Sequence, residues 1–143
     1  MFVSQDRNQL RRMFFEVWRK QHDLIPMEPL EKLIAEIIRW HPEYHEVLNK
    51  QEASLERDYL PEVGQTNPFL HMGMHIAIHE QMASQRPEGI VDVFRSLTSR
   101  YDDAHEAEHY MMECLAEMLW QAQRDGTMPD ETVYMENLRK LVS

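Results

Sequence analysis

The chain has 143 residues, of which 43% are hydrophobic, so its composition fits one globular domain and not a disordered segment. Its formal net charge of −10 argues against binding to nucleic acid or to an anionic membrane surface, because phosphate contacts need clustered Lys and Arg. The single Cys excludes an internal disulfide and suits a reducing compartment. Residues 1–10 show no secretion signal, and no apolar run approaches the ~20 residues of a membrane-spanning helix. We therefore expect a cytoplasmic protein.

The first predicted helix covers residues 5–21. Its apolar side chains recur at helical spacing: Leu10, Met13, Phe14, Val17 and Trp18. Its basic side chains are interpreted as a solvated face: Arg7, Arg11, Arg12, Arg19 and Lys20. With Phe15, the Met and aromatic side chains are wider than one narrow stripe. They are therefore also our candidate for an exposed surface that docks a protein partner or a second copy.

A second helix is predicted over residues 29–41, because Pro29 suits a first helical position and Leu and Ile recur along one side. Pro42 ends this helix and starts a short third one. Residues 51–66 contain Pro61 and Gly64 and predict a long loop.

Asn67 and Pro68 combine a capping side chain with Pro at the first helical position, which predicts a fourth helix to about residue 84. The segment 86–89 interrupts the helical pattern, and a fifth helix is predicted after it. A sixth helix is predicted over 104–124, with Asp102 or Asp103 as its N-terminal cap and Gly126 after its end. Thr127 and Asp130 resemble a capping box for a last helix. Because no segment has strand periodicity, we predict an all-α protein, a single-domain bundle of six to seven helices over residues 1–143.

Five of the eight histidines lie on the fourth and sixth predicted helices: His71, His75, His79, His105 and His109. By helical angle, His79 is predicted within the apolar face of the fourth helix, His75 toward one edge, and His71 further round. His105 and His109 lie on one flank of the sixth helix, which Glu113 continues. Imidazoles at i and i+4 stand one turn apart on one face, which is a chelating spacing.

His71 and His75 lie in the first two turns of the fourth predicted helix, and His105 and His109 lie in the first two turns of the sixth. If these helices run parallel as neighbours, a cluster of imidazoles between them can bind zinc, nickel or iron. The first candidate ligands are His75, His105 and His109, with His71 or His79 as a fourth. Glu106 or Glu113 is the candidate general base, or the candidate hydrogen-bond partner of a metal ligand.

Other interpretations remain open. The segment 105–109 reads H-E-x-x-H, the zinc protease pattern, but nothing predicts the sheet that usually lines such a cleft. The alternative to metal binding is a non-catalytic interaction module whose histidines are packing residues; a third hypothesis is a pH response of half-buried imidazoles. Packing or surface roles are predicted for His22, His41 and His45, and Cys114 is predicted to be a buried core thiol.

Several segments of the chain together form a distinctive pattern. The central one is NPFLHMGMHIAIHEQ at 67–81, together with HEAEH at 105–109 and MECL at 112–115. Further segments are WRK at 18–20, IIRWHPEYH at 37–45 and AQR at 122–124. Over nearly the whole chain, these segments resemble the signature of an uncharacterised, mainly proteobacterial family, domain of unknown function 1841. The resemblance implies a cytosolic bacterial protein of this size. It implies no activity and supplies no established functional residues.

Overall fold

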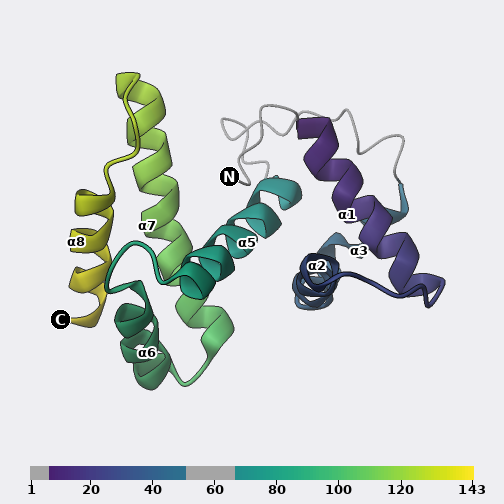
Figure 1. The fold of residues 1–143 in the computed structure, drawn as a ribbon, viewed down its shortest axis with the longest axis horizontal. Coiled ribbons are helices and arrows are strands. Elements are labelled where there is room, and N and C mark those ends of the chain that lie inside the picture. The colour runs from purple at the N-terminus through teal and green to yellow at the C-terminus, as the bar shows by residue number, and fades with distance from the viewer. Residues whose placement is uncertain (1–6, 51–66) are drawn as a thin grey trace. The chain divides into compact units, whose positions relative to one another are not determined.

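The computed structural model describes residues 7–50 and 67–143, and every regular element in these two ranges is helical (Figure 1). The described residues form seven α-helices and one 3-10 helix, which confirms the predicted all-α class. The predicted loop over 51–66 lies outside the described residues. The chain divides into two compact units, unit 1 (Met1–Ile76) and unit 2 (Ala77–Ser143). The division falls within helix α5, and the prediction of a single domain stays a prediction.

Unit 1 contains the helices α1 (Arg7–His22), α2 (Pro29–Arg39), η1 (Pro42–Tyr44), α3 (His45–Asn49) and the first half of α5 (Pro68–Ser84). Helix α1 packs against α2 and α3. The core centres on Phe69 of α5, whose ring centroid lies 6.1 Å from that of Phe14 and 5.7 Å from that of Phe15. Around these rings lie further buried side chains: Val17, Ile34, Ile37, Ile38, Leu48, Met72 and Ile76.

The aromatic side chains of α1 are core residues. Phe14 and Phe15 are buried, and Met13 and Trp18 pack against the same core. The prediction that these four side chains form an exposed docking surface is therefore wrong for Phe14 and Phe15, because Phe69 and its neighbours cover them. The width of the stripe reflects contact with several helices of unit 1.

The basic residues of α1 form the predicted solvated face only in part: Arg12 and Arg19 are exposed, whereas Arg11 is buried and Lys20 is half-buried. Arg11 is buried, and its guanidinium carbon lies 4.8 Å from the centroid of the Phe69 ring, a cation–π geometry. Lys20 donates to Glu31 at 2.7 Å, which ties α1 to α2. Arg19 forms ion pairs with Glu16 and Asp23, while Arg12 is exposed.

Unit 2 contains the second half of α5 with the helices α6 (Ile90–Tyr101), α7 (Ala104–Asp125) and α8 (Glu131–Val142). The helices α6, α7 and α8 pack against one another. Buried side chains from all three form the core: Ile90, Val93, Leu97, Ala107, Met111, Leu115, Tyr134, Met135 and Leu138. The hydroxyl of Tyr134 donates to Oε1 of Gln81 at 2.7 Å, so α8 is also fixed to the end of α5.

Capping side chains set the helix boundaries close to where the sequence predicts them. The Asn67 side chain accepts from the backbone N–H of residue 69 at 3.0 Å, and Asp103 accepts from that of His105 at 3.0 Å. Gly126 ends α7 with a φ of 65°, in the left-handed region that glycine adopts without strain. The predicted capping box is wrong: Asp130 itself is the N-cap of α8 and accepts from Thr132 and Val133, so Thr127 precedes the cap.

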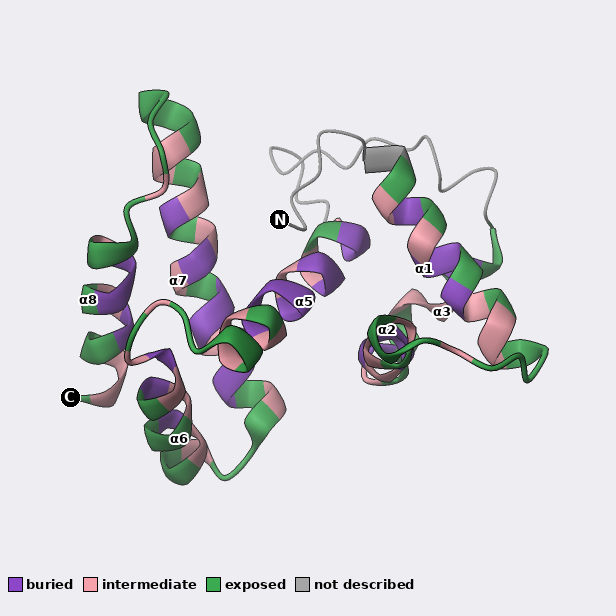
Figure 2. Ribbon diagram, in the orientation of Figure 1, coloured by how far each residue is buried: buried purple, intermediate pink, exposed green. Residues whose placement is uncertain are grey.

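Helix α5 is buried around most of its circumference. Figure 2 shows buried residues along most of α5, with exposed residues gathered toward its C-terminal end. Because apolar residues occupy all sides of the helix, no single stripe defines a buried face, and the predicted angular order of its histidines is wrong. His75 is 0% exposed, whereas the side chain of His79, predicted deeper, is 33% exposed.

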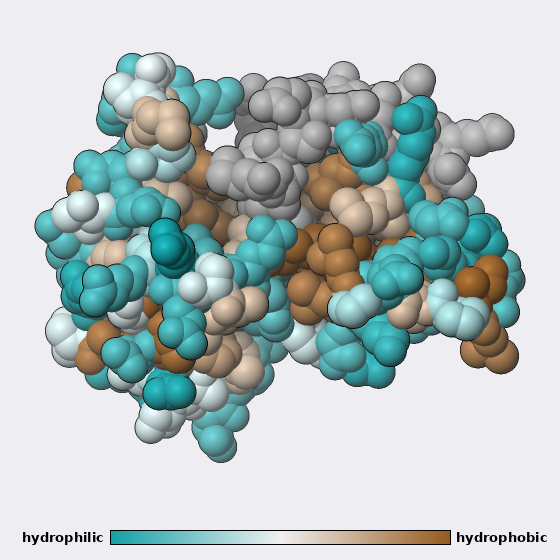
Figure 3. All heavy atoms as spheres, viewed as in Figure 1, coloured by the Kyte–Doolittle hydropathy of each residue, from teal (hydrophilic) through white to brown (hydrophobic). Residues whose placement is uncertain are grey.

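Within the described residues no helix is long and apolar enough to cross a membrane. On the face drawn in Figure 3, hydrophilic side chains cover most of the surface over α6, α7 and α8, with isolated hydrophobic ones among them. Single exposed hydrophobic residues are normal on protein surfaces.

We expect Phe69→Ala to lower the free energy of unfolding by about 3–5 kcal/mol, because it removes the ring that Phe14 and Phe15 surround and leaves a cavity. Leu70→Ala is the matched control, since Leu70 is the next residue on α5 and is exposed. Urea unfolding measures both variants. Equal losses of stability would contradict this description of the core.

Candidate metal centre

Three histidine rings meet in unit 1 and are called here the histidine triangle. His41 follows α2, while His71 and His75 lie one turn apart on α5. The His41 ring centroid lies 4.9 Å from that of His71 and 4.8 Å from that of His75, and the centroids of His71 and His75 are 5.0 Å apart. The ring planes are inclined to one another by 57° to 79°, so the rings do not stack. The three imidazoles form a nearly equilateral arrangement.

The size of the histidine triangle suits one transition-metal ion. With metal–nitrogen bonds of about 2.0–2.1 Å, a tetrahedral ion bound by three imidazoles holds their ring centroids roughly 5 Å apart. The observed separations fall close to this value. His41 is 2% exposed and His75 0%, while His71 is partly buried. The rings are therefore held within the protein before any ion binds.

A hydrogen bond fixes the tautomer of His41. Its Nδ1 lies 2.7 Å from the carbonyl oxygen of Ile37, which can only accept, so Nδ1 carries the proton. In the neutral ring Nε2 then has the lone pair, and this atom lies 3.1 Å from Nε2 of His71. Metal-binding histidines commonly donate their other ring N–H to a backbone carbonyl in this way. His41 therefore presents a ligand atom toward the histidine triangle.

Two aromatic rings flank the histidine triangle. Tyr44 stacks on His41 with the ring centroids 5.4 Å apart, and Trp40 approaches His75 edge-on at 6.2 Å. Burial, assisted by the charge of Glu43, raises the pKa of the Tyr44 hydroxyl, so this side chain stays neutral. Such apolar walls limit the access of water to a metal site.

The sequence predicts a packing or surface role for His41, which fits its burial and its bond to the Ile37 carbonyl, but it does not predict a ligand role. The available signal was the apolar stripe of α2, because Ile34, Ile37 and His41 follow one another at helical spacing and all three are buried. The packing or surface role predicted for the other two histidines agrees with the structure, in which His22 is exposed and His45 is half-buried. His22 Nδ1 lies 3.0 Å from the carbonyl oxygen of Trp18, and His45 Nε2 lies 3.0 Å from that of Ile38.

Unit 2 contains a second histidine arrangement, which we call the chelating pair. His105 and His109 lie in the first two turns of α7, both partly buried. Their Nε2 atoms are 3.0 Å apart, and their ring centroids are 4.4 Å apart. The two imidazoles thus turn the same ring atom toward one point, as the i, i+4 spacing predicts for a chelate. Asp103 caps this end of the helix and so determines which turn contains the pair.

A buried carboxylate lies beside the chelating pair in sequence. Glu108 is 3% exposed, and its Oε1 and Oε2 lie 3.0 Å and 3.1 Å from Nε2 of His79. Glu108 is not among the predicted site residues, although it falls on the same side of α7 as the buried residues Met111 and Met112. The hydrogen bond from Nε2 of His79 accounts for a carboxylate at such a position, because a buried charged group without a hydrogen-bond partner is strongly unfavourable.

The two glutamates that we predicted as general base or as hydrogen-bond partner of a metal ligand lie on the surface. Glu106, the glutamate of the H-E-x-x-H pattern, and Glu113 are both exposed. Water competes for exposed carboxylates and allows them many orientations. Their assignment as catalytic or outer partners stays a prediction.

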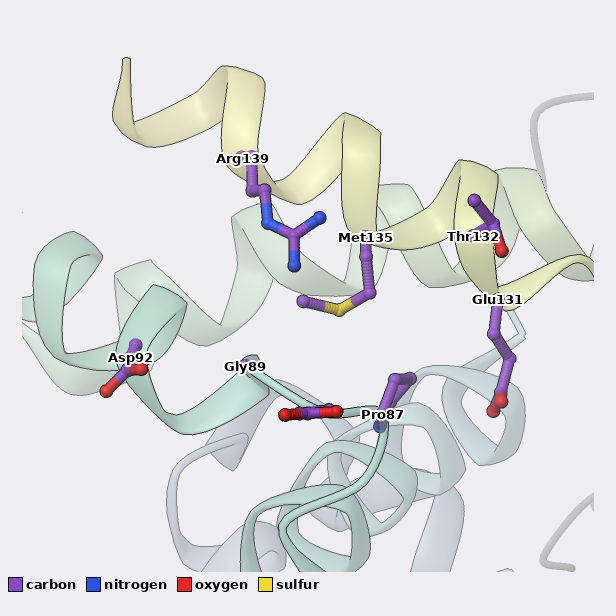
Figure 4. Close-up of a pocket in the computed structure, with 8 residues that line it drawn as sticks. Pro87, Gly89, Asp92, Glu131, Thr132, Met135 and Arg139 are labelled. Atoms are coloured by element: carbon purple, nitrogen blue, oxygen red, sulfur yellow. The ribbon is translucent and has the colours of Figure 1, made fainter.

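A separate groove of about 470 Å³ lies between the start of α6 and α8 (Figure 4). Arg139 and Met135 extend into it from α8, opposite Gly89. Its carboxylates are Glu88, Asp92 and Glu131. No histidine is among its lining residues, so the groove is distinct from both histidine arrangements.

Comparison with known proteins identifies one family. A family model described as "Domain of unknown function (DUF1841)" matches residues 6–140. Neither the curated proteins nor the solved structures contain a match to the chain. The residues of the site must therefore be interpreted from their own chemistry.

We expect Cys114 to react slowly with thiol reagents at neutral pH. Burial raises the pKa of this thiol, and the negative charge of Glu113 raises it further; the thiolate is the reactive form. Labelling with a chromogenic disulfide should be much slower in the native chain than in urea-unfolded chain. Cys114 is half-buried in the structure, not fully buried as predicted, and equally fast labelling in both states would contradict its protection by the fold.

Proposed function

The chain belongs to the family described as domain of unknown function DUF1841, and we propose that it is a metal-binding protein whose centre is built from histidine imidazoles. The observation that supports this most directly is the histidine triangle, with three ring centroids 4.8 to 5.0 Å apart. An isolated packing histidine needs only a hydrogen-bond partner, as His22 and His45 illustrate. Three imidazoles packed against one another are better explained by a shared ion.

The ligand chemistry favours a borderline transition metal. The three rings offer neutral nitrogen atoms, which suit zinc, nickel and ferrous iron. Magnesium and calcium prefer oxygen ligands. We therefore propose zinc, nickel or iron as the bound ion. The net charge of −10 also attracts cations to the protein.

Burial of the site is compatible with neutral imidazoles. Burying a neutral ring costs little free energy if its N–H finds an acceptor, and the acceptor for His41 is the carbonyl oxygen of Ile37. Protonated rings at these separations would repel one another. Metal binding removes this repulsion between protonated rings, because the ion holds each ligating imidazole in its neutral form. We infer that binding weakens in acid.

His105 and His109 are proposed as further metal ligands. Their Nε2 atoms, 3.0 Å apart, support a chelating role by themselves. The sequence-based prediction that His75, His105 and His109 bind one ion stays a prediction. The number of zinc ions bound per chain tests it.

We expect untagged apo protein to bind zinc, and His71→Gln to weaken that binding by at least about 100-fold, since even a residue in the outer shell of a metal site contributes about 10–100-fold. His71 is the preferred position because it is only partly buried, so substitution perturbs the core least. Isothermal titration calorimetry measures the affinity. Zinc at 100 times its dissociation constant should stabilise the chain by about 2.7 kcal/mol.

His22→Gln and His45→Gln are the matched controls, because both histidines contact backbone carbonyls in unit 1 but lie outside the histidine triangle. Circular dichroism should show equal helicity in all variants. Equal zinc affinity in His71→Gln and the controls, or no effect of zinc, nickel or iron on wild-type stability, would argue against the proposed function.

A further inference from the structure

The groove between the start of α6 and α8 is a feature of unit 2 that metal binding does not use (Figure 4). Its volume of about 470 Å³ falls within the range of about 300–1,000 Å³ that small-molecule sites have. Its charged side chains, all exposed, are those of Glu88, Asp92, Glu131 and Arg139. Within residues 7–50 and 67–143, none of these four side chains forms an ion pair or a hydrogen bond.

One side of α8 presents an acid, an apolar side chain and a base in that order. Glu131, Met135 and Arg139 are spaced i, i+4 and i+8, so they lie along one side of the helix. Met135 is 5% exposed, whereas the two charged residues are exposed to solvent. At a rise of 1.5 Å per residue, the backbone positions of the acid and the base are about 12 Å apart. The α8 side of the groove therefore has a negative end, an apolar middle and a positive end.

The start of α6 adds a second carboxylate at the positive end. A Cβ atom on Gly89 would lie 3.4 Å from Nη2 of Arg139 and 3.5 Å from Cε of Met135, so the guanidinium packs against the backbone where α6 begins. Asp92 lies in the first turn of the same helix. In Figure 4, Asp92 and Glu131 lie at opposite ends of the groove, with Met135 between them. One end thus combines a guanidinium with a carboxylate, and the other end has a carboxylate.

This order of charges favours a zwitterion over a simple ion. The three carboxylates repel an anion, and the guanidinium repels a metal cation or a plain amine. A guanidinium pairs with a carboxylate through two parallel hydrogen bonds, whereas Asp92 and Glu131 attract cationic groups. A basic α-amino acid has a carboxylate and an ammonium at one end, methylene groups in the middle and a cation at the other end. Its chemical order therefore matches the order of side chains along the groove.

We propose that the groove is a binding site for a free basic α-amino acid, and that arginine, the longest of these, fits it best. The α-carboxylate pairs with Arg139 and the α-ammonium pairs with Asp92. The side-chain guanidinium pairs with Glu131, and the methylene groups pack on Met135. Glu88 adds a negative charge that balances the net positive charge of the ligand. No histidine is among the lining residues, so this site is independent of the proposed metal centre.

The test measures binding of L-arginine to the full chain without zinc, by isothermal titration calorimetry at low ionic strength. Two analogues each remove one charge: agmatine lacks the α-carboxylate, and L-citrulline has a neutral side chain of nearly the same shape. Arginine should bind in the millimolar range or more tightly. Each analogue should bind about fivefold more weakly, which corresponds to the loss of one ion pair open to solvent.

Two variants assign the two ends of the ligand. Arg139→Gln should weaken arginine binding about fivefold without weakening agmatine binding, because agmatine has no carboxylate to lose. Glu131→Gln should likewise weaken arginine binding without weakening citrulline binding. The matched controls are Lys140→Gln and Glu136→Gln, which change the charge in the same way at exposed positions of α8 outside the groove. Both controls should retain the wild-type affinity, and circular dichroism should show equal helicity in all four variants.

Three results would overturn the inference: no binding of arginine at millimolar concentration, tighter binding of agmatine than of arginine, or equal losses of affinity in Arg139→Gln and Lys140→Gln. Tighter binding of agmatine is the result expected if a chain with a net charge of −10 merely attracts cations. Because the measurement uses chain without zinc, its outcome is separate from that of the metal-binding proposal.

Discussion

The hydrogen bond from Nδ1–H of His41 to the carbonyl oxygen of Ile37 determines what the histidine triangle can bind. It connects the end of α2 to a side chain that is almost fully buried, and it makes Nε2 the lone-pair nitrogen. The contact with His71 then joins α2 to the start of α5. The packing of Phe69 against α1 holds α5 in the same core. The candidate chemistry of unit 1 thus depends on a backbone acceptor placed by ordinary helix geometry.

Unit 2 shows the same principle with a side-chain acceptor. There the fixed imidazole is His79, and the group that fixes it is the buried carboxylate of Glu108. A carbonyl oxygen and a carboxylate can both only accept, so each determines which ring nitrogen donates its hydrogen. The donor is Nδ1 in His41 and Nε2 in His79.

Most of the fold could be predicted from local signals. Asn67, Asp103 and Gly126 act where the sequence places them, because a cap depends on only a few neighbouring residues. The site was predicted less well, because its key features are tertiary. The angular order of His75 and His79 followed from assuming one apolar face, yet α5 is buried on most sides. His41 and Glu108 were not predicted as site residues because the contacts that reveal them are tertiary. His41 meets His71 across 30 residues, and Glu108 meets His79 across 29.

The most direct test of the central claim is X-ray absorption at the zinc edge on the zinc-loaded wild-type chain. We predict a first shell of nitrogen atoms at about 2.0 Å, with the outer-shell scattering that imidazole rings produce. At least three imidazoles should be needed to fit the spectrum. A first shell of water and carboxylate oxygens without imidazole scattering, or protein that retains no zinc, would contradict a histidine metal centre.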